Sequence, residues 1–145
     1  MAFEIANFHL SFSTTAGTDV LNITSQVAEK AAASRIGEGQ VLVFVPGSTA
    51  ALTTIEYESG VVRDMMEAIE RIAPENLHYR HDERWGDGNG YAHVRAALLG
   101  PSLTVPLIDG HLMLGTWQQI VLIDFDNRPR KRRILVQVSG SKSRI

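Results

Sequence analysis

The alternation of hydrophobic and polar residues predicts several β-strands. From Phe3 to Phe12, apolar and polar residues alternate with a period of two, which is typical of a half-buried strand. The continuous apolar run Gln40–Pro46 predicts a central strand that is covered on both faces. Segments rich in Thr, Ile, Val and Leu predict further strands at Ala51–Tyr57, Gln119–Phe125 and Ile134–Val138.

Other segments carry the spacing of helices and turns. Apolar residues recur three or four positions apart in Asp19–Ser34 and in Val61–Pro74, which predicts two longer helices. Ala92–Leu99 predicts a short helix, Tyr79–Glu83 an extended segment, and Asp109-Gly110 a two-residue hairpin turn. The order of these predicted strands and helices along the chain predicts an α+β fold with a mainly antiparallel, sandwich-like sheet, two longer helices and one short helix.

Composition narrows the class of protein. The 145 residues predict a single domain over 1–145, and 44% hydrophobic with 21% charged residues is ordinary for globular proteins. The formal charge of −2 gives no broad field toward nucleic acid, and the absence of Cys excludes disulfides and thiolate metal sites. No apolar stretch has the length of a membrane span, so we expect a cytoplasmic protein without membrane or nucleic-acid partners. The basic run Arg128–Arg133 has the charge to contact RNA or phosphate groups, but the preferred interpretation is a charged hairpin tip or edge strand.

The segment Tyr79–Gly100 concentrates the residues that can carry chemistry. His81 and His93 lie twelve positions apart, and acids, an Asn and a glycine-rich turn separate them. If that turn folds back, both imidazoles come to one side. We therefore expect a functional site here, while a polar loop that satisfies buried backbone groups is the structural alternative.

Three uses of this segment remain open. The two histidines and a carboxylate from Asp87 or Glu56 match a 2-His-1-carboxylate metal site. One His that is oriented by Asp87 can act as general acid or base near neutral pH. Alternatively, the group is a hydrogen-bonding network for a polar ligand, with Asn89 as donor and acceptor. His9, His78 and His111 stand alone on other segments and are expected to face solvent.

The polar turn Pro46–Thr49 follows the predicted central strand. Backbone N–H groups and hydroxyls in such a turn can contact an anionic ligand, although a purely structural turn fits the pattern equally. The chain carries no dinucleotide fingerprint, Walker A loop, nucleophile elbow or helical zinc motif.

The motifs of this chain and their order resemble those of the YjbQ-like family, whose members are also called secondary thiamine-phosphate synthases. The matching residues are Asn22-Ile23-Thr24, Ser48 to Thr53 with Glu56, Tyr79-x-His81, Gly86-Asp87-x-Asn89, Ala92-His93, Leu98-Leu99-Gly100, Gly110 and Gly115-Thr116-Trp117-Gln118. The resemblance implies a cytoplasmic homotrimer with a polar cleft near a subunit boundary, a phosphorylated small-molecule ligand and weak thiamine-phosphate synthase activity.

The resemblance also assigns roles to residues. It implies catalytic roles for His81, His93, Asp87 and Glu56, and a divalent metal, Zn or Mg, held by His81, His93 and Asp87. The implied substrate-binding residues are Ser48, Thr49, Asn89, Trp117 and Gln118. One departure matters, because Gly47 stands where the family carries His. A trimer that binds a small molecule or metal without catalysis is therefore the alternative function.

Overall fold

The computed structural model describes residues 2–142, so the first and the last three residues of the expected domain lie outside the described residues. The strands are β1 (Phe3–Ser13), β2 (Asp19–Asn22), β3 (Ile36–Phe44), β4 (Ala50–Glu56), β5 (Ser102–Ile108), β6 (His111–Leu112), β7 (Gln118–Asp124) and β8 (Lys131–Lys142). The helices are α1 (Thr24–Ser34), α2 (Ser59–Ile72), α3 (Arg80–Trp85) and α4 (Gly90–Leu99).

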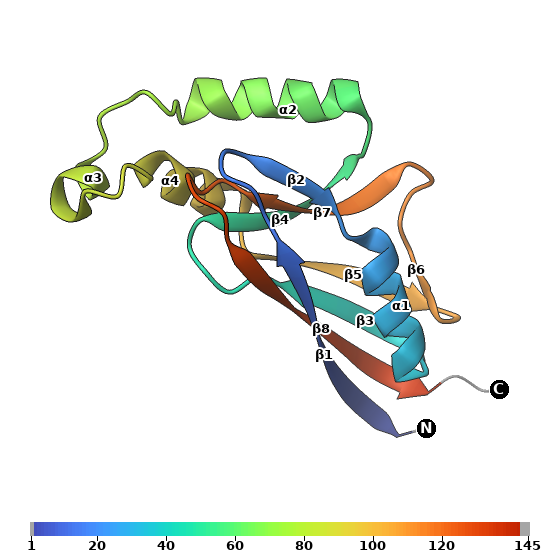
Figure 1. Cartoon of the computed structure of the whole chain (residues 1–145). Coiled ribbons are helices and arrows are strands. Elements are labelled where there is room, and N and C mark those ends of the chain that lie inside the picture. Colours follow the sequence, from blue (N-terminus) through green and yellow to red (C-terminus); the bar gives the residue numbers. More distant parts are fainter. Residues whose placement is uncertain (1, 143–145) are drawn as a thin grey trace.

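The strands form two antiparallel sheets (Figure 1). The larger sheet has the order β1-β8-β3-β5-β6, and the smaller sheet has the order β2-β7-β4. The predicted hairpin is confirmed: β5 pairs with β6, and Asp109 and Gly110 between them both have positive φ. The predicted α+β class with a sandwich-like, antiparallel sheet is also confirmed.

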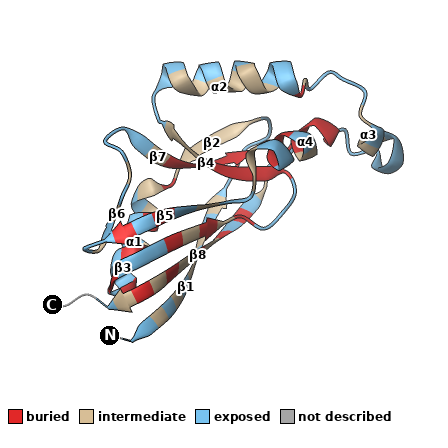
Figure 2. Cartoon of the chain, turned by 180° about the vertical axis from the view of Figure 1, so that it is seen from behind, coloured by how far each residue is buried: buried red, intermediate tan, exposed pale blue. Residues whose placement is uncertain are grey.

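The main core lies between the two sheets and α1. Alternate residues of β3 and β8, such as Val41 and Val136, are fully buried against Leu52 and Leu122 of the smaller sheet. Val27 of α1 belongs to the same cluster. The alternation of buried and less buried residues along β8 is visible in Figure 2. The period-two pattern of the sequence therefore becomes the inner face of a sandwich.

A second, smaller core lies on the other face of the three-stranded sheet. Val121, Ile123 and Phe125 pack there against Tyr91 and Ala92 of α4, and residues of α2 pack at its margin. No residue of α2 is fully buried. Helix α4 is therefore the element that this core fixes in place, and α4 carries His93.

Three local predictions were wrong. Asp19–Asn22 was expected to be helical but pairs with β7, so the helix begins later, at Thr24. Tyr79–Glu83 was expected to be extended, whereas Arg80–Trp85 forms the short helix α3. The basic run was placed on a hairpin tip or an edge strand, but β8 lies between β1 and β3 and carries part of this run into the sheet. For Asp19–Asn22 and for the basic run, strand pairing overrode the local pattern.

None of the helices in the described part of the chain has the length and apolar character needed to cross a bilayer.

Candidate functional site

A polar pocket of about 320 Å³ opens where β7 ends and β8 begins. We call it the His–Arg cleft. Its lining comes from the loop after β3, from the region of α3 and α4, and from β8 with the turn before it: Gly47, Ser48, Thr49, His81, Trp85, Asp87, Asn89, His93, Arg130 and Arg132. The cleft thus collects groups from three separate parts of the chain, two of which were predicted to be functional.

Arg132 and Asp124 form a buried ion pair beneath the cleft. Asp124 is fully buried and Arg132 is 8% exposed. Arg132 donates from Nε to Asp124 Oδ2 at 2.7 Å and from Nη2 to Asp124 Oδ1 at 2.9 Å. Thr14 adds a hydrogen bond to the same carboxylate at 2.7 Å. This two-point geometry fixes the plane of the guanidinium, so its position is set before any ligand arrives.

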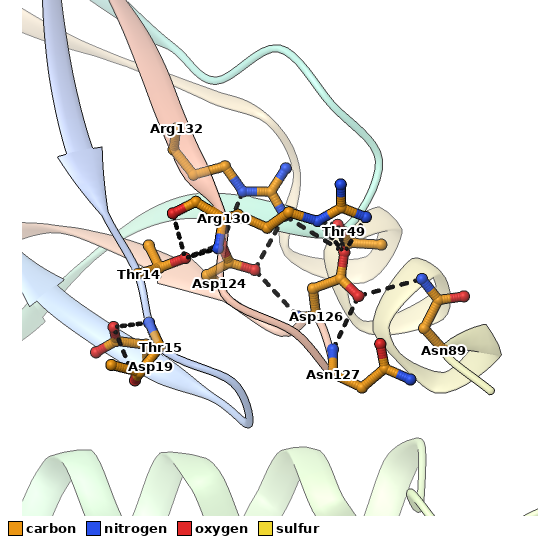
Figure 3. A network of polar contacts seen from close by, with 10 residues as sticks. All are labelled: Thr14, Thr15, Asp19, Thr49, Asn89, Asp124, Asp126, Asn127, Arg130 and Arg132. Atoms are coloured by element: carbon orange, nitrogen blue, oxygen red, sulfur yellow. Dashed lines mark hydrogen bonds and ion pairs between the residues drawn. The ribbon is translucent and has the colours of Figure 1, made fainter. Parts of the chain in front are cut away.

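Asp126 anchors the second guanidinium. Arg130 donates from Nε to Asp126 Oδ2 at 2.8 Å, and Thr49 Oγ1 donates to the same oxygen at 3.0 Å. Asn89 donates to Asp126 Oδ1 at 3.2 Å. Thr49 also accepts a hydrogen bond of 2.6 Å from Arg132 Nη2 and so connects the two ion pairs. Figure 3 shows the two arginines beside these carboxylates, with Asn89 approaching from the α4 side.

Both carboxylates remain ionised. Burial by itself would raise the pKa of Asp124, but the hydrogen bonds from Arg132, Thr14 and the backbone of Asp126 bring this pKa below its usual value. Burial likewise opposes ionisation of Asp126, and the hydrogen bonds from Asn89, the Asn127 backbone, Thr49 and Arg130 lower its pKa nonetheless. Each arginine therefore has a charged partner that holds it in place.

His81 and His93 both line the cleft, and their rings lie against each other. Their ring centroids are 4.3 Å apart and the rings are inclined by 38°. Burial and the neighbouring His81 together lower the pKa of His93 below its ordinary value of 6.5. At neutral pH His93 is therefore uncharged, which leaves a ring nitrogen able to accept a proton or a hydrogen bond.

Two buried polar atoms of the cleft make no hydrogen bond in the described part of the chain: Asn89 Oδ1, and His81 Nδ1, which lies 3.5 Å from Asp82 Oδ1. Asn89 is 4% exposed, and its amide nitrogen is already used by Asp126. A buried polar atom without a partner is unfavourable by about 1–3 kcal/mol. Because both residues line the cleft, a ligand with a hydrogen-bond donor would satisfy the open oxygen of Asn89.

Glycines shape the two walls of the cleft. Gly86 has a φ of +69° and ends α3 in the left-handed conformation, which turns the chain back toward α4. Gly47 has a φ of +119°, and a Cβ at this position would lie 2.9 Å from Arg132 Nη1. The absence of a side chain at Gly47 therefore leaves room for Nη1 of Arg132.

The structure brings together six of the predicted site residues and separates three others. The six that line the cleft are His81, His93, Asp87, Asn89, Ser48 and Thr49. Glu56 lies at the far end of β4, about 20 Å of strand away from the cleft end. Gln118 pairs with Glu56 and donates to Thr54 at 3.0 Å, and the neighbouring Trp117 is 72% exposed. These three residues are not part of the His–Arg cleft within this chain.

The predicted metal centre lacks a complete ligand set. In residues 2–142 no three His, Cys, Asp or Glu side chains lie close enough together to hold a metal ion. His81 and His93 supply two imidazoles, but Asp87 does not complete the set in this arrangement. The residues present do not fit a three-ligand centre, and binding of Zn or Mg stays a prediction.

Sequence analysis named Arg130 and Arg132 only as members of the basic run, and it did not single out Asp124 or Asp126. A signal for Arg132 was present, because period-two alternation places it on the same strand face as Ile134 and Val136, which are buried. An arginine on an inward face needs a buried acid as its partner. Asp124, at the end of an apolar strand, is that acid. His9, His78 and His111 are exposed, as predicted.

The fold and the cleft define a class of small α+β proteins with two antiparallel sheets and a cleft lined by histidine and arginine. A family model described as UPF0047 protein YjbQ-like matches residues 8–141. A UPF0047 protein from Archaeoglobus fulgidus is 41% identical over 128 residues, which make up 88% of this chain and 97% of the relative. A UPF0047 protein from Methanothermobacter thermautotrophicus is 38% identical over 137 residues, 94% of each chain.

Solved structures agree with this. The crystal structure of a YbjQ-like protein of unknown function from Sulfolobus solfataricus has a TM-score of 0.92 and 31% identity, covering 97% of this chain and 100% of that chain. A YjbQ/UPF0047 protein from Clostridium acetobutylicum has a TM-score of 0.82 and 32% identity, covering 90% and 98% of the two chains. The chain belongs to the YjbQ-like (UPF0047) family.

Proposed function

We propose that the His–Arg cleft binds the phosphate or diphosphate group of a small organic molecule. The observation that carries this proposal is the pair of arginines, each held by a buried aspartate and each lining the same polar pocket. Planar guanidinium groups held in a fixed orientation suit phosphate oxygens, which they contact through several N–H donors. The open acceptor of Asn89 adds a requirement for a donor on the ligand, such as a hydroxyl or amine.

We propose that the protein catalyses the thiamine-phosphate synthase reaction with low activity. In that transfer the thiazole nitrogen of a thiazole phosphate forms a bond to the methylene carbon of a pyrimidine methyl diphosphate. The carbon–oxygen bond to the diphosphate breaks, and pyrophosphate leaves with the electron pair. Arg130 and Arg132 would stabilise the charge that develops on the leaving group. The neutral His93 would accept a hydrogen bond from the substrate, and Asp87 lies at the rim beside the histidines.

Phosphate binding is tested with pyrophosphate by isothermal titration calorimetry. Arg130→Gln should weaken binding at least tenfold, since charge-assisted hydrogen bonds contribute about 1.5–3 kcal/mol. Arg128→Gln is the matched control, because Arg128 is exposed and does not line the cleft. Equal affinity of wild type and Arg130→Gln would contradict the proposed anion site.

The transferase activity is tested separately with both phosphorylated halves as substrates. We expect product with the wild type and none above background with His81→Ala combined with His93→Ala. If the wild type forms no more product than this double variant, the enzyme proposal fails while the binding proposal stands. Metal analysis of the purified protein, with the same double variant as control, tests the predicted Zn or Mg.

A second candidate is binding without catalysis, which Gly47 favours. The cleft carries two imidazoles, and Gly47 stands at the position where the family carries His; a Cβ there would lie 2.9 Å from Arg132 Nη1. In this case pyrophosphate binds, and no product forms.

We further propose that the chain assembles as a homotrimer. Large apolar side chains such as Leu98, Met113 and Trp117 are between 52% and 72% exposed in the isolated chain, which suits coverage by another subunit. Sedimentation velocity decides this point: a single species with the mass of one chain would contradict it.

A further inference from the structure

A second pocket adjoins the His–Arg cleft and differs from it in character. It has a volume of about 210 Å³, and it shares Gly47, Ser48 and His93 with the cleft. The remaining lining consists of Ala50, Ala96, Ala97 and Pro101, so this pocket is apolar wherever the two do not overlap. His93 therefore stands between a polar compartment with two arginines and an apolar compartment without a charge.

The apolar compartment exists because of small side chains at helical spacing. Ala96 and Ala97 follow His93 by three and four residues on α4, so all three residues lie on one face of the helix. Alanine at both positions leaves open the space that longer side chains would fill. Ala97 is exposed, in contrast to Ala96, which belongs to the core under α4.

The size of the compartment limits what it can hold. An apolar cavity of about 150 Å³ is enough for a benzene ring. A compartment of 210 Å³ therefore admits one six-membered ring or a branched group of similar size.

Because the two pockets adjoin and share Gly47, Ser48 and His93, we infer that the apolar pocket is a subsite for the organic part of a ligand. The phosphate of the same ligand lies on Arg130 and Arg132. The inference rests on the proposed phosphate binding and adds to it the class of ligand. That class is a phosphate ester with a compact apolar or aromatic group close to the phosphate. Ser48 and His93 form the wall past which the ester reaches, because both line the two pockets. A ring in this position excludes water from the side of His93 that faces the subsite.

The test compares three probes by calorimetry: inorganic phosphate, methyl phosphate and phenyl phosphate. With the wild type, we expect phenyl phosphate to bind about tenfold more tightly than methyl phosphate, from the apolar area of one partly buried ring. In Ala97→Leu the leucine fills the subsite, so this preference should fall to within twofold. Binding of inorganic phosphate should stay within twofold of the wild type.

Ala33→Leu is the matched control, an exposed alanine on α1 outside both pockets. It should keep the full preference for phenyl phosphate, and thermal melting should show both variants folded. Equal affinity of the wild type for methyl and phenyl phosphate overturns the proposal that the apolar pocket is a subsite, while the proposal of phosphate binding stands. A preference that persists in Ala97→Leu overturns it as well, because the ring then lies elsewhere, for example on Trp85 in the cleft. Absence of phosphate binding in the wild type overturns the subsite together with the proposed function.

Discussion

Replacing Arg132 by methionine is the sharpest test of how the cleft is built. The change keeps an unbranched apolar stem and removes the guanidinium with its charge and donors. Asp124, which is fully buried, then loses two of its hydrogen bonds and its counter-ion. Removing one partner of a buried ion pair destabilises a protein by about 3–5 kcal/mol. That is a large part of the roughly 5–15 kcal/mol by which domains are stable.

Urea unfolding followed by circular dichroism measures this loss. With a slope of about 2 kcal/mol per molar urea, the midpoint of Arg132→Met should fall by about 2 M. Arg133→Met is the matched control, because Arg133 is the next residue of β8 and is exposed on the other strand face. Its free energy of unfolding should stay within about 0.5 kcal/mol of the wild type.

A double variant separates the charge from the packing. In Asp124→Asn combined with Arg132→Met no buried carboxylate is left without a partner, so at least about 1 kcal/mol of the loss should return.

The pH dependence of stability gives a second check. Since the pKa of Asp124 is lowered in the folded protein, its ionic contribution is present above the ordinary carboxyl pKa and is lost as the pH falls through the lower folded value. The difference between wild type and Arg132→Met should therefore shrink in acid. A loss below about 1 kcal/mol at neutral pH would refute the view that Asp124 and Arg132 form a rigid anion support.

The remaining predictions concern the cleft. NMR titration should find the pKa of His93 below 6.5, and His81→Gln should raise it, since burial and His81 lower it; an unchanged value in the variant would rule out the contribution of His81. Because the folded state favours neutral His93, stability should decrease as the pH falls from above 6.5 through the lower folded pKa, which urea titrations at several pH values can follow. Asp87→Asn should tighten pyrophosphate binding a few-fold in calorimetry, because a carboxylate at the rim repels an anion; weaker binding would instead favour a role for Asp87 in orienting a histidine. Gly47→Ala should weaken pyrophosphate binding, because the added Cβ displaces Nη1 of Arg132 and strains a backbone with positive φ; unchanged affinity would show that Nη1 does not contact the ligand.

Local patterns predicted the elements whose faces are regular. The strand at the start of the chain and the Asp109-Gly110 hairpin follow from alternation and turn chemistry alone, and both are present. The helical segment at Arg80–Trp85 did not follow, because six residues without an apolar stripe give no period to detect. Its position next to α4 nevertheless fulfils the expectation that His81 and His93 meet, although the segment that carries His81 is helical where an extended one was expected.

Residue content predicted two of the three parts of the cleft, and tertiary structure supplied the third, which carries Arg130 and Arg132. The histidines and Asn89 were visible because polar, titratable groups cluster between Tyr79 and Gly100. Glu56 was considered as an alternative carboxylate ligand and Gln118 was added through family resemblance, and strand register places them opposite each other at the far end of β4 and β7. Linear order alone cannot reveal this distance, since a seven-residue strand carries its two ends about 20 Å apart.

The basic run shows most clearly how fold converts composition into a site. On an edge strand its charges would point into solvent and prevent unwanted pairing, which is the reading that local sequence favoured. On a strand with neighbours on both sides, alternation directs Arg132 inward while Lys131 and Arg133 remain exposed. An arginine that points inward is tolerated only beside a buried carboxylate. Asp124, the last residue of β7, is that carboxylate, and it accepts a hydrogen bond from Arg132 Nε. Strands β7 and β8 therefore both complete the sandwich and set the charge and the geometry of the cleft. The loop at Gly47 leaves the guanidinium of Arg132 room to contact a ligand.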